Sequence, residues 1–185
     1  MLGLPNWCQN TLKIYSEDTN SIKAFKMNAK GKDTDLSLNN LYPMPKELED
    51  TASPPTIVAD KDYKTEVAKR IEANKTNKNF QQSLPITKAM SERLIVNYGT
   101  DNWYDWKVQK WGTKWDVEAE LIDEDKNHLE YQFDSAWSPP TAWLAKVSKD
   151  YPLLQFILKY EEEGMGFMGR TKAHGNSFDD QTLNT

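Results

Sequence analysis

The first part of the chain alternates apolar and polar residues and then changes to helical spacing. Leu12 and Ile14 share one face of residues 9–15, which predicts a β-strand. From residue 16 several side chains that can cap a helix precede apolar residues spaced as on one helical face, and Gly31 is expected to end this helix. The pattern therefore predicts a strand followed by an amphipathic helix.

The middle of the chain, about residues 36–112, interrupts this arrangement. Residues 36–41 predict a short strand, and a proline-rich loop follows because proline cannot continue regular structure. Three stretches with helical spacing come next, and their apolar positions are Tyr63, Val67 and Ile71, then Met90, Leu94 and Tyr98, then Tyr104, Val108 and Trp111. We expect a largely helical insertion.

After residue 115 the hydrophobic period becomes two. Residues 117–121 and 129–133 each place apolar side chains on one face, and the polar segment 123–127 between them predicts a turn and therefore a β-hairpin. Ser138 followed by two prolines signals a helix start, and residues 154–160 alternate as another strand.

The order strand, helix, insertion, hairpin, helix, strand is the split β-α-β-β-α-β pattern. We therefore expect an α+β, ferredoxin-like fold with an antiparallel sheet and helices on one face. Residues 1–170 would form a single domain with the insertion over about 36–112, and the polar residues 171–185 would form a flexible tail.

Composition is compatible with one folded domain in a reducing compartment. The chain has 185 residues, of which 38% are hydrophobic, enough to fold without covalent staples. Its one cysteine, Cys8, can form no disulfide within the chain and excludes a cluster held by four thiolates. The start carries no basic region followed by an apolar run, and no stretch approaches the roughly 20 apolar residues of a membrane span. A soluble cytoplasmic protein is expected.

Charge is unevenly distributed along the chain. The net charge is −5, which argues against attachment to nucleic acid through phosphate neutralisation. Residues 61–93 carry eight Lys or Arg against four acids, whereas residues 116–134 carry eight acids and one lysine. The acidic segment suits a basic protein partner by complementarity, or both segments are solvated faces that keep the protein soluble.

Five of the seven tryptophans lie within residues 103–137. Such a cluster anchors a core or a core-to-insertion seam, or it forms a stacking or partner surface. The sequence favours the core and leaves the surface open as the alternative. The candidate ligand or partner surface comprises Trp103, Trp106, Trp111, Lys114, Trp115, Asp134, Trp137 and Arg170.

No catalytic, cofactor or metal-ligating set emerges from the remaining motifs. Ser138 is better explained as a helix cap than as a nucleophile, and the glycines of 164–169 lack the residues of a phosphate loop. Residues 123–134 share some spacing with a calcium loop, but His128 occupies the position where that loop needs glycine. An acid/base pair of Asp134 and Glu161 on neighbouring strands stays open. The outward sheet face is predicted to be acidic and nearly free of aromatics, which disfavours single-stranded RNA.

Six motifs resemble one known family. They are PNWCQN (5–10), LYPMPKEL (41–48), WYDW (103–106), WGTKWD (111–116), FDSAWSPP (133–140) and YEEEGMGF (160–167). Together they resemble the YubB ferredoxin-like domain family, small proteins carried by phages and plasmids of bacteria, over nearly the whole chain. The resemblance implies a ferredoxin-like fold and a mobile-element setting, and it transfers no catalytic residue and no iron–sulfur cluster.

Two hypotheses of function follow. The first is a non-enzymatic accessory protein of a phage or plasmid that binds a host macromolecule, with a protein favoured over nucleic acid and no membrane partner. The alternative is a small-molecule binding protein or enzyme in which Trp111, Trp115 or Trp137 stacks on a nucleotide-like ligand and Lys114 or Arg170 meets its phosphate. No cofactor is expected, and the oligomeric state stays open.

Overall fold

A computed structural model of the chain describes residues 6–77 and 81–184. These residues divide into two compact units. The first, which we call the sheet unit, comprises the residues up to 43 and those from 109 onward; the second, the inserted unit, comprises residues 44–108. The inserted unit is shorter than the insertion expected over about 36–112, because the segments on either side of it pack with the sheet unit.

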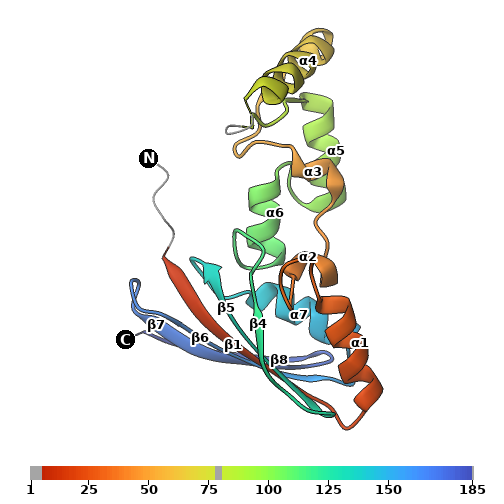
Figure 1. Cartoon of the computed structure of the whole chain (residues 1–185). Coiled ribbons are helices and arrows are strands. Elements are labelled where there is room, and N and C mark those ends of the chain that lie inside the picture. The colour runs from red at the N-terminus through yellow and green to blue at the C-terminus, as the bar shows by residue number, and fades with distance from the viewer. Residues whose placement is uncertain (1–5, 78–80, 185) are drawn as a thin grey trace. The chain divides into compact units, whose positions relative to one another are not determined.

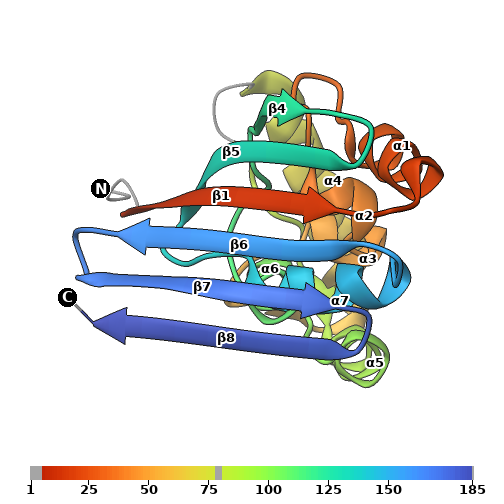
Figure 2. The ribbon, with the colours of Figure 1, turned by 90° about the horizontal axis from the view of Figure 1, so that it is seen from below.

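The sheet unit is built on one six-stranded antiparallel sheet with the strand order β4-β5-β1-β6-β7-β8 (Figure 2). The strands are β1 (Trp7–Tyr15), β4 (Glu120–Glu124), β5 (His128–Ala136), β6 (Gln155–Glu162), β7 (Phe167–His174) and β8 (Ser177–Asn184). β1 lies between β5 and β6 and pairs with both. Its alternating sequence is that of a strand with one face buried and one face exposed.

Helices cover one face of this sheet (Figure 1). They are α1 (Thr19–Ala29), α2 (Leu38–Leu41) and α7 (Thr141–Asp150). Asp18 caps α1 by accepting hydrogen bonds from the main-chain N–H groups of Asn20 at 3.1 Å and Ser21 at 3.2 Å. The apolar side chains of helices and sheet meet in a core that includes Leu12, Ile14, Phe25, Tyr131, Phe133, Leu144, Val147, Phe156 and Leu158.

Two buried tryptophans fasten the segment around α2 to this core. The indole N–H of Trp143 donates to the carbonyl of Leu38 at 3.1 Å, and that of Trp111 donates to the carbonyl of Tyr42 at 2.9 Å. Both side chains are almost fully buried, and a buried indole N–H needs such a partner.

The expectation that residues 36–41 form a strand is wrong: Ser37 accepts from the N–H of Asn40 at 3.2 Å and starts the helix α2 instead.

The elements β1, α1, β4, β5, α7 and β6 follow one another as expected for the split β-α-β-β-α-β pattern. The strands of this pattern lie in the order β4-β5-β1-β6, so the two strands joined by each helical crossover are separated by another strand. The prediction of an α+β, ferredoxin-like fold is confirmed.

The expectation of a flexible tail from residue 171 is wrong. β7 pairs with β6 from Phe167 to His174, and β8 pairs with β7 and forms the edge of the sheet. The side chain of Asp180 on β8 accepts from Thr171 at 2.6 Å and from the Tyr160 hydroxyl at 3.0 Å. Polar side chains therefore link these strands, which explains why an apolar pattern did not reveal them.

The inserted unit is mostly helical. Its elements are α3 (Lys46–Glu49), β2 (Ile57–Val58), α4 (Asp60–Thr76), β3 (Ile86–Thr87) and α5 (Lys88–Tyr98), followed by α6 (Trp103–Lys110), which runs two residues past the unit. β2 and β3 pair in parallel. Glu47 accepts hydrogen bonds from Arg93 at 2.8 Å and from the Tyr98 hydroxyl at 2.7 Å, so α3 is tied to α5.

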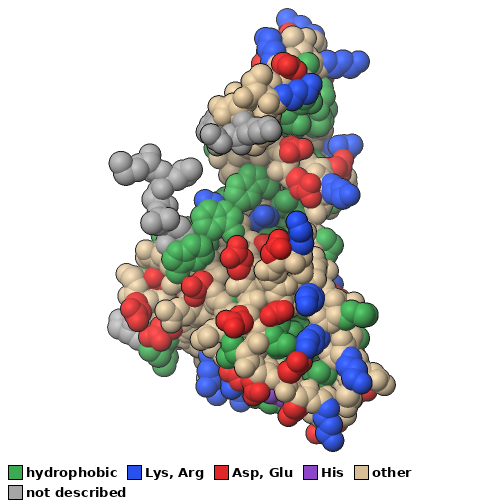
Figure 3. All heavy atoms as spheres, in the orientation of Figure 1, with side chains coloured by type: hydrophobic (Ala, Val, Ile, Leu, Met, Phe, Trp, Pro, Cys, Tyr) green, Lys and Arg blue, Asp and Glu red, His purple; other side chains and the backbone are tan. Residues whose placement is uncertain are grey.

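The apolar stripe expected on α4 is not buried. None of the residues of α4 is buried, and charged side chains project from this helix (Figure 3). In α5 the predicted stripe contributes one buried residue, Leu94, and in α6 the buried residue is Trp106 while Val108 is exposed. No helix in the described ranges 6–77 and 81–184 has both the length and the apolar character to cross a bilayer.

Candidate functional site

The eight residues expected to form one surface have different environments. Trp106 and Trp111 are only 3% and 1% exposed, so neither contributes to a surface. Trp103 is partly exposed in the inserted unit, where its ring meets Tyr104 edge-on at 5.7 Å and Lys107 Nζ lies 5.4 Å from its centroid. The remaining five residues lie in the sheet unit.

Three tryptophans are half exposed in the sheet unit, and we call them the tryptophan surface: Trp7, Trp115 and Trp137, which are 46%, 38% and 43% exposed. The rings of Trp7 and Trp115 pack with their centroids 5.9 Å apart. The residue before Trp137, Ala136, pairs with Trp7 between β5 and β1. Segments distant in the sequence thus bring large aromatic side chains to one end of the sheet.

Lys114 belongs to the same surface. Its ammonium group lies 4.6 Å from the centroid of the Trp115 ring, within the range of a cation–π contact. Such a contact restricts the Trp115 ring while both side chains stay accessible. Trp115, Trp137 and Lys114 were expected here, whereas Trp7 was missed, although the alternation of β1 places it on the outward face together with Gln9 and Thr11.

The main chain around Trp137 is held in an uncommon conformation. Trp137 has a φ of +72°, which bulky residues rarely adopt, and its N–H donates to the carbonyl of Asn6 at 2.9 Å. Thr113 donates to the carbonyl of Ala136 at 2.9 Å, and Ser135 donates to the carbonyl of Ser138 at 2.8 Å. Hydrogen bonds on both sides thus hold Trp137 in this conformation.

The same contacts explain two of the sequence motifs. Asn10, which is buried on β1, donates to Ser135 Oγ at 2.8 Å, and Ser138 Oγ donates to the carbonyl of Gly112. The expectation that Ser138 caps α7 with its side chain is therefore wrong: Pro140 is the N-cap residue and makes no side-chain cap hydrogen bond. The motifs at 111–116 and 133–140 bond to each other and position the tryptophan surface.

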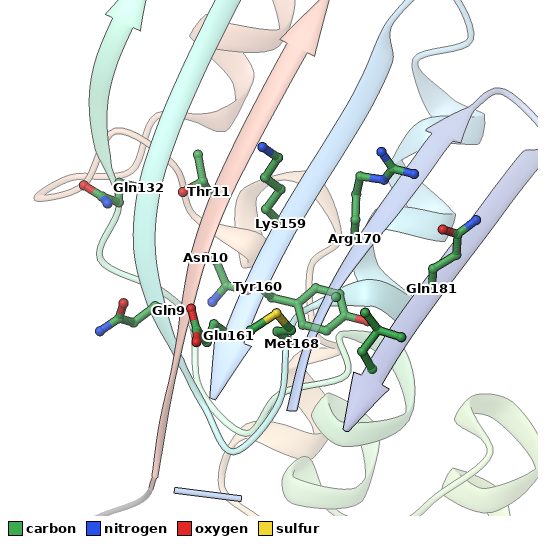
Figure 4. A pocket seen from close by; sticks show the side chains of 12 residues that line it. Gln9, Asn10, Thr11, Gln132, Lys159, Tyr160, Glu161, Met168, Arg170 and Gln181 are labelled. Atoms are coloured by element: carbon green, nitrogen blue, oxygen red, sulfur yellow. The ribbon is translucent and has the colours of Figure 1, made fainter. Parts of the chain in front are cut away.

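A concave region of about 510 Å³ lies on the sheet face opposite the helices (Figure 4). It is lined by residues of β1, β5, β6, β7 and β8, and Arg170 is one of them. Gln9 also lines it and lies two residues from Trp7 on the same face of β1, so the concave region adjoins the tryptophan surface. Asp134 is opposite Gln9 on β5 and exposed, outside this lining.

Charge on this open face is divided between its two sides. The β4–β5 side carries Glu120, Asp123, Glu130 and Asp134, whereas the β6–β7 side carries the three cations Lys159, Arg170 and Lys172 and one acid, Glu161. Lys13 pairs with Glu130 at 2.7 Å, and this hydrogen bond raises the pKa of the Lys13 ammonium group. The face was predicted to be acidic, which is correct for the β4–β5 side only. Residues 164–169 were expected to form a turn or a further short strand and residues from 171 onward a tail, so Arg170 and Lys172 were not placed on this face.

The arrangement offers no support for the acid/base pair of Asp134 and Glu161. Both residues face Gln9, but from β5 and β6 on opposite sides of β1, so they do not lie on neighbouring strands. Burial raises the pKa of the Cys8 thiol to about 12, which suppresses the nucleophilic thiolate. Within the described part of the chain, no group of three or more His, Cys, Asp or Glu side chains is arranged to hold a metal ion.

Comparisons with known proteins agree with this architecture. A family model described as the ferredoxin-like domain in Api92-like protein matches residues 110–183, the region from the end of α6 to β8. The crystal structure of protein api92 from Yersinia pseudotuberculosis is similar over 98% of this chain and 99% of that chain, with a TM-score of 0.53 and 11% sequence identity. At this identity the similarity shows the fold alone. No curated protein sequence matches the chain.

Proposed function

We propose that the chain is a non-enzymatic binding protein that contacts a protein of a bacterial host through the tryptophan surface. The observation that carries the proposal is the presence of three half-exposed tryptophans, Trp7, Trp115 and Trp137, at one end of the sheet. Tryptophan is enriched among the residues that dominate binding energy at protein interfaces, because its large area becomes desolvated on contact. Exposed aromatic clusters on a folded domain commonly mark interaction sites.

The rigidity of this surface supports the proposal. The hydrogen bonds around Trp137 and the packing of Trp7 on Trp115 fix the aromatic groups before a partner arrives. A fixed surface loses less conformational entropy on binding than a mobile one. Acidic side chains on the adjacent β4–β5 side of the sheet favour a partner with basic residues next to an apolar pocket.

The setting we propose is that of a phage or plasmid accessory protein acting in the bacterial cytoplasm. The resemblance of the sequence motifs to the YubB ferredoxin-like domain family supports this setting. A host protein involved in replication, nucleic-acid processing or defence is the kind of target that such an accessory protein would meet. We favour a protein over nucleic acid because the net charge of −5 opposes sequence-independent binding to phosphates.

The test isolates the tagged protein from bacterial lysate and identifies co-purifying proteins by mass spectrometry. The candidate partner is then purified, and its affinity is measured for the unmodified protein and for the variants Trp7→Ala and Trp115→Ala. Either substitution should weaken binding by about 2 kcal/mol or more, as expected for a hot-spot residue. The matched control is Phe178→Ala, which removes an aromatic side chain of similar exposure (41%) from the edge strand β8.

The proposal fails if no purified host protein binds, or if Phe178→Ala weakens binding as much as Trp115→Ala does. Circular dichroism and thermal unfolding of each variant establish that the sheet unit is intact. Turnover of a metabolite by the purified protein would also contradict a non-enzymatic role.

A further inference from the structure

The concave region on the open sheet face contains two neighbouring cationic side chains. Lys159 on β6 and Arg170 on β7 are directly opposite each other in the register of these strands. Both side chains line the region and point to the same face (Figure 4). Directly opposed residues on antiparallel strands have Cα atoms about 5 Å apart, so the two charges repel each other.

Neither cation of this pair is held by a carboxylate in the described residues. Neither Lys159 nor Arg170 forms an ion pair there, although both are exposed. Of the acids on this face, Glu130 is engaged by Lys13 at 2.7 Å, and Asp179 accepts from Gln181 at 3.0 Å. Glu161 lines the same region two residues along β6 from Lys159 and forms no ion pair with either cation. Like charges that face each other without a counter-charge destabilise a sheet, and an anion bound between them would remove the repulsion.

The next row of residues differs in character. It comprises Gln9, Glu161, Met168 and Leu183, which are opposite one another across β1, β6, β7 and β8. Two residues along a strand span about 6.6 Å, so this row lies about 6.6 Å along the strands from Lys159 and Arg170. A ligand held by the two cations can therefore also contact this row. Glu161 and Gln9 can accept hydrogen bonds, whereas Met168 and Leu183 offer an apolar floor.

We propose that this region is a nucleotide site in which Lys159 and Arg170 hold the phosphate. The guanidinium group of Arg170 can bind two phosphate oxygens at once, and the ammonium group of Lys159 supplies a second positive charge. The base lies over Met168 and Leu183, and its amino group donates to Glu161 or Gln9. A volume of about 510 Å³ is in the range of small-molecule sites.

This inference goes beyond the proposed contact with a host protein, since it concerns different side chains and a different ligand.

The test titrates the full chain with AMP, adenosine, inorganic phosphate and a 5′-phosphorylated oligonucleotide. Binding is measured by calorimetry and by the NMR signal of the Met168 methyl group, assigned with the variant Met168→Leu. The informative variants are Lys159→Gln and Arg170→Gln. The matched control is Lys172→Gln, which removes a charge from the same face of β7 at a residue outside the lining.

We expect AMP to bind and to shift the Met168 signal, and adenosine to bind more weakly. Lys159→Gln and Arg170→Gln should each weaken AMP binding by about tenfold or more, because a charge-assisted hydrogen bond is lost. Lys172→Gln should change it by no more than about twofold, since that charge contributes only through the screened long-range field. The thermal stability of Arg170→Gln without ligand should equal or exceed that of the unmodified protein, because repulsion is removed.

Three results would overturn the proposal. If AMP neither releases heat nor shifts the NMR signal of Met168, the site does not exist. If Lys172→Gln weakens AMP binding as much as Lys159→Gln and Arg170→Gln do, AMP is attracted by the general charge of this face and not by a site. An oligonucleotide whose affinity exceeds that of AMP and grows with length would identify a nucleic-acid strand as the occupant instead of a mononucleotide. None of Trp7, Trp115 and Trp137 lines this region, so failure of the host-protein proposal is observed separately.

Discussion

The ring of Tyr160 on β6 occupies the space that a side chain on Gly169 of β7 would fill. The two residues are opposite each other in the sheet, and the Tyr160 hydroxyl continues past Gly169 to Thr182 Oγ1 at 2.6 Å and Asp180 Oδ1 at 3.0 Å on β8. The Tyr160 side chain thereby crosses β7 and connects β6 to β8. The absence of a side chain at residue 169 permits this connection, which holds the edge strand on the sheet.

Gly169→Ala should therefore destabilise the protein. An added Cβ atom would meet the Tyr160 ring and would lie 2.6 Å from the main-chain oxygen of Gln181, so strand or ring must move. We expect a loss of about 1–3 kcal/mol in the free energy of unfolding, measured by chemical denaturation. Tyr160→Leu removes the ring, so the double variant should lose less than the sum of the two single losses. Additive losses would contradict the steric explanation.

Asp116 organises the segment before α2. Its carboxylate accepts from the Leu38 N–H at 2.6 Å, from the Ser37 hydroxyl at 2.6 Å and from the Val117 N–H at 2.9 Å. Asp116→Ala leaves these donors without their partner and should cost about 2–3 kcal/mol of unfolding free energy, since hydrogen bonds to charged groups are the stronger ones. The control Glu118→Ala removes a nearby exposed acid and should change stability by about 0.5 kcal/mol or less. Similar losses in the two variants would refute this role.

The sequence was sufficient for the parts of the fold whose side chains alternate between core and solvent. β1, β5 and β6 each bury every second residue, so their period of two predicted the ferredoxin-like order. β8 has no buried residue, and its partner β7 buries only Thr171 and Ala173. Main-chain pairing and the polar contact of Thr171 with Asp180 hold this hairpin, so no apolar pattern could reveal it.

The candidate site was predictable only in part, because two tryptophans in one motif can have opposite environments. Trp111 and Trp115 are four residues apart in a segment that mostly lies outside regular structure, yet one is 1% and the other 38% exposed. Local spacing decides burial only within a helix or strand, and here the fold of distant segments decides it. The concave region needed β7 and β8, so Lys159 could not be paired with Arg170 from the sequence.

Fluorescence quenching should separate six of the seven tryptophans into two groups, with the partly exposed Trp103 between them. Trp7, Trp115 and Trp137 are 46%, 38% and 43% exposed, whereas Trp106, Trp111 and Trp143 are 3%, 1% and 1% exposed. Iodide, which stays in water, should quench the first group and leave the second group unquenched. The variants Trp115→Phe and Trp137→Phe should therefore lower the quenchable fraction of the emission, and Trp143→Phe should raise it. An unchanged fraction in Trp115→Phe would mean that this ring is covered in solution.

Cys8 should make the protein less stable at high pH. Burial raises the pKa of its thiol from 9.0 to about 12, so the unfolded chain loses this proton at a lower pH than the folded chain does. The contribution of Cys8 to stability is therefore complete below pH 9 and declines from pH 9 to about 12, by at most about 1.4 kcal/mol per pH unit. Denaturation measured across this range should give a steeper decline for the unmodified protein than for Cys8→Ala, which shares every other titrating group.

In the folded protein at pH 8 the thiol should react with a disulfide reagent far more slowly than in denaturant, because it is fully buried. Parallel pH profiles together with rapid reaction of the native thiol would show that Cys8 reaches solvent.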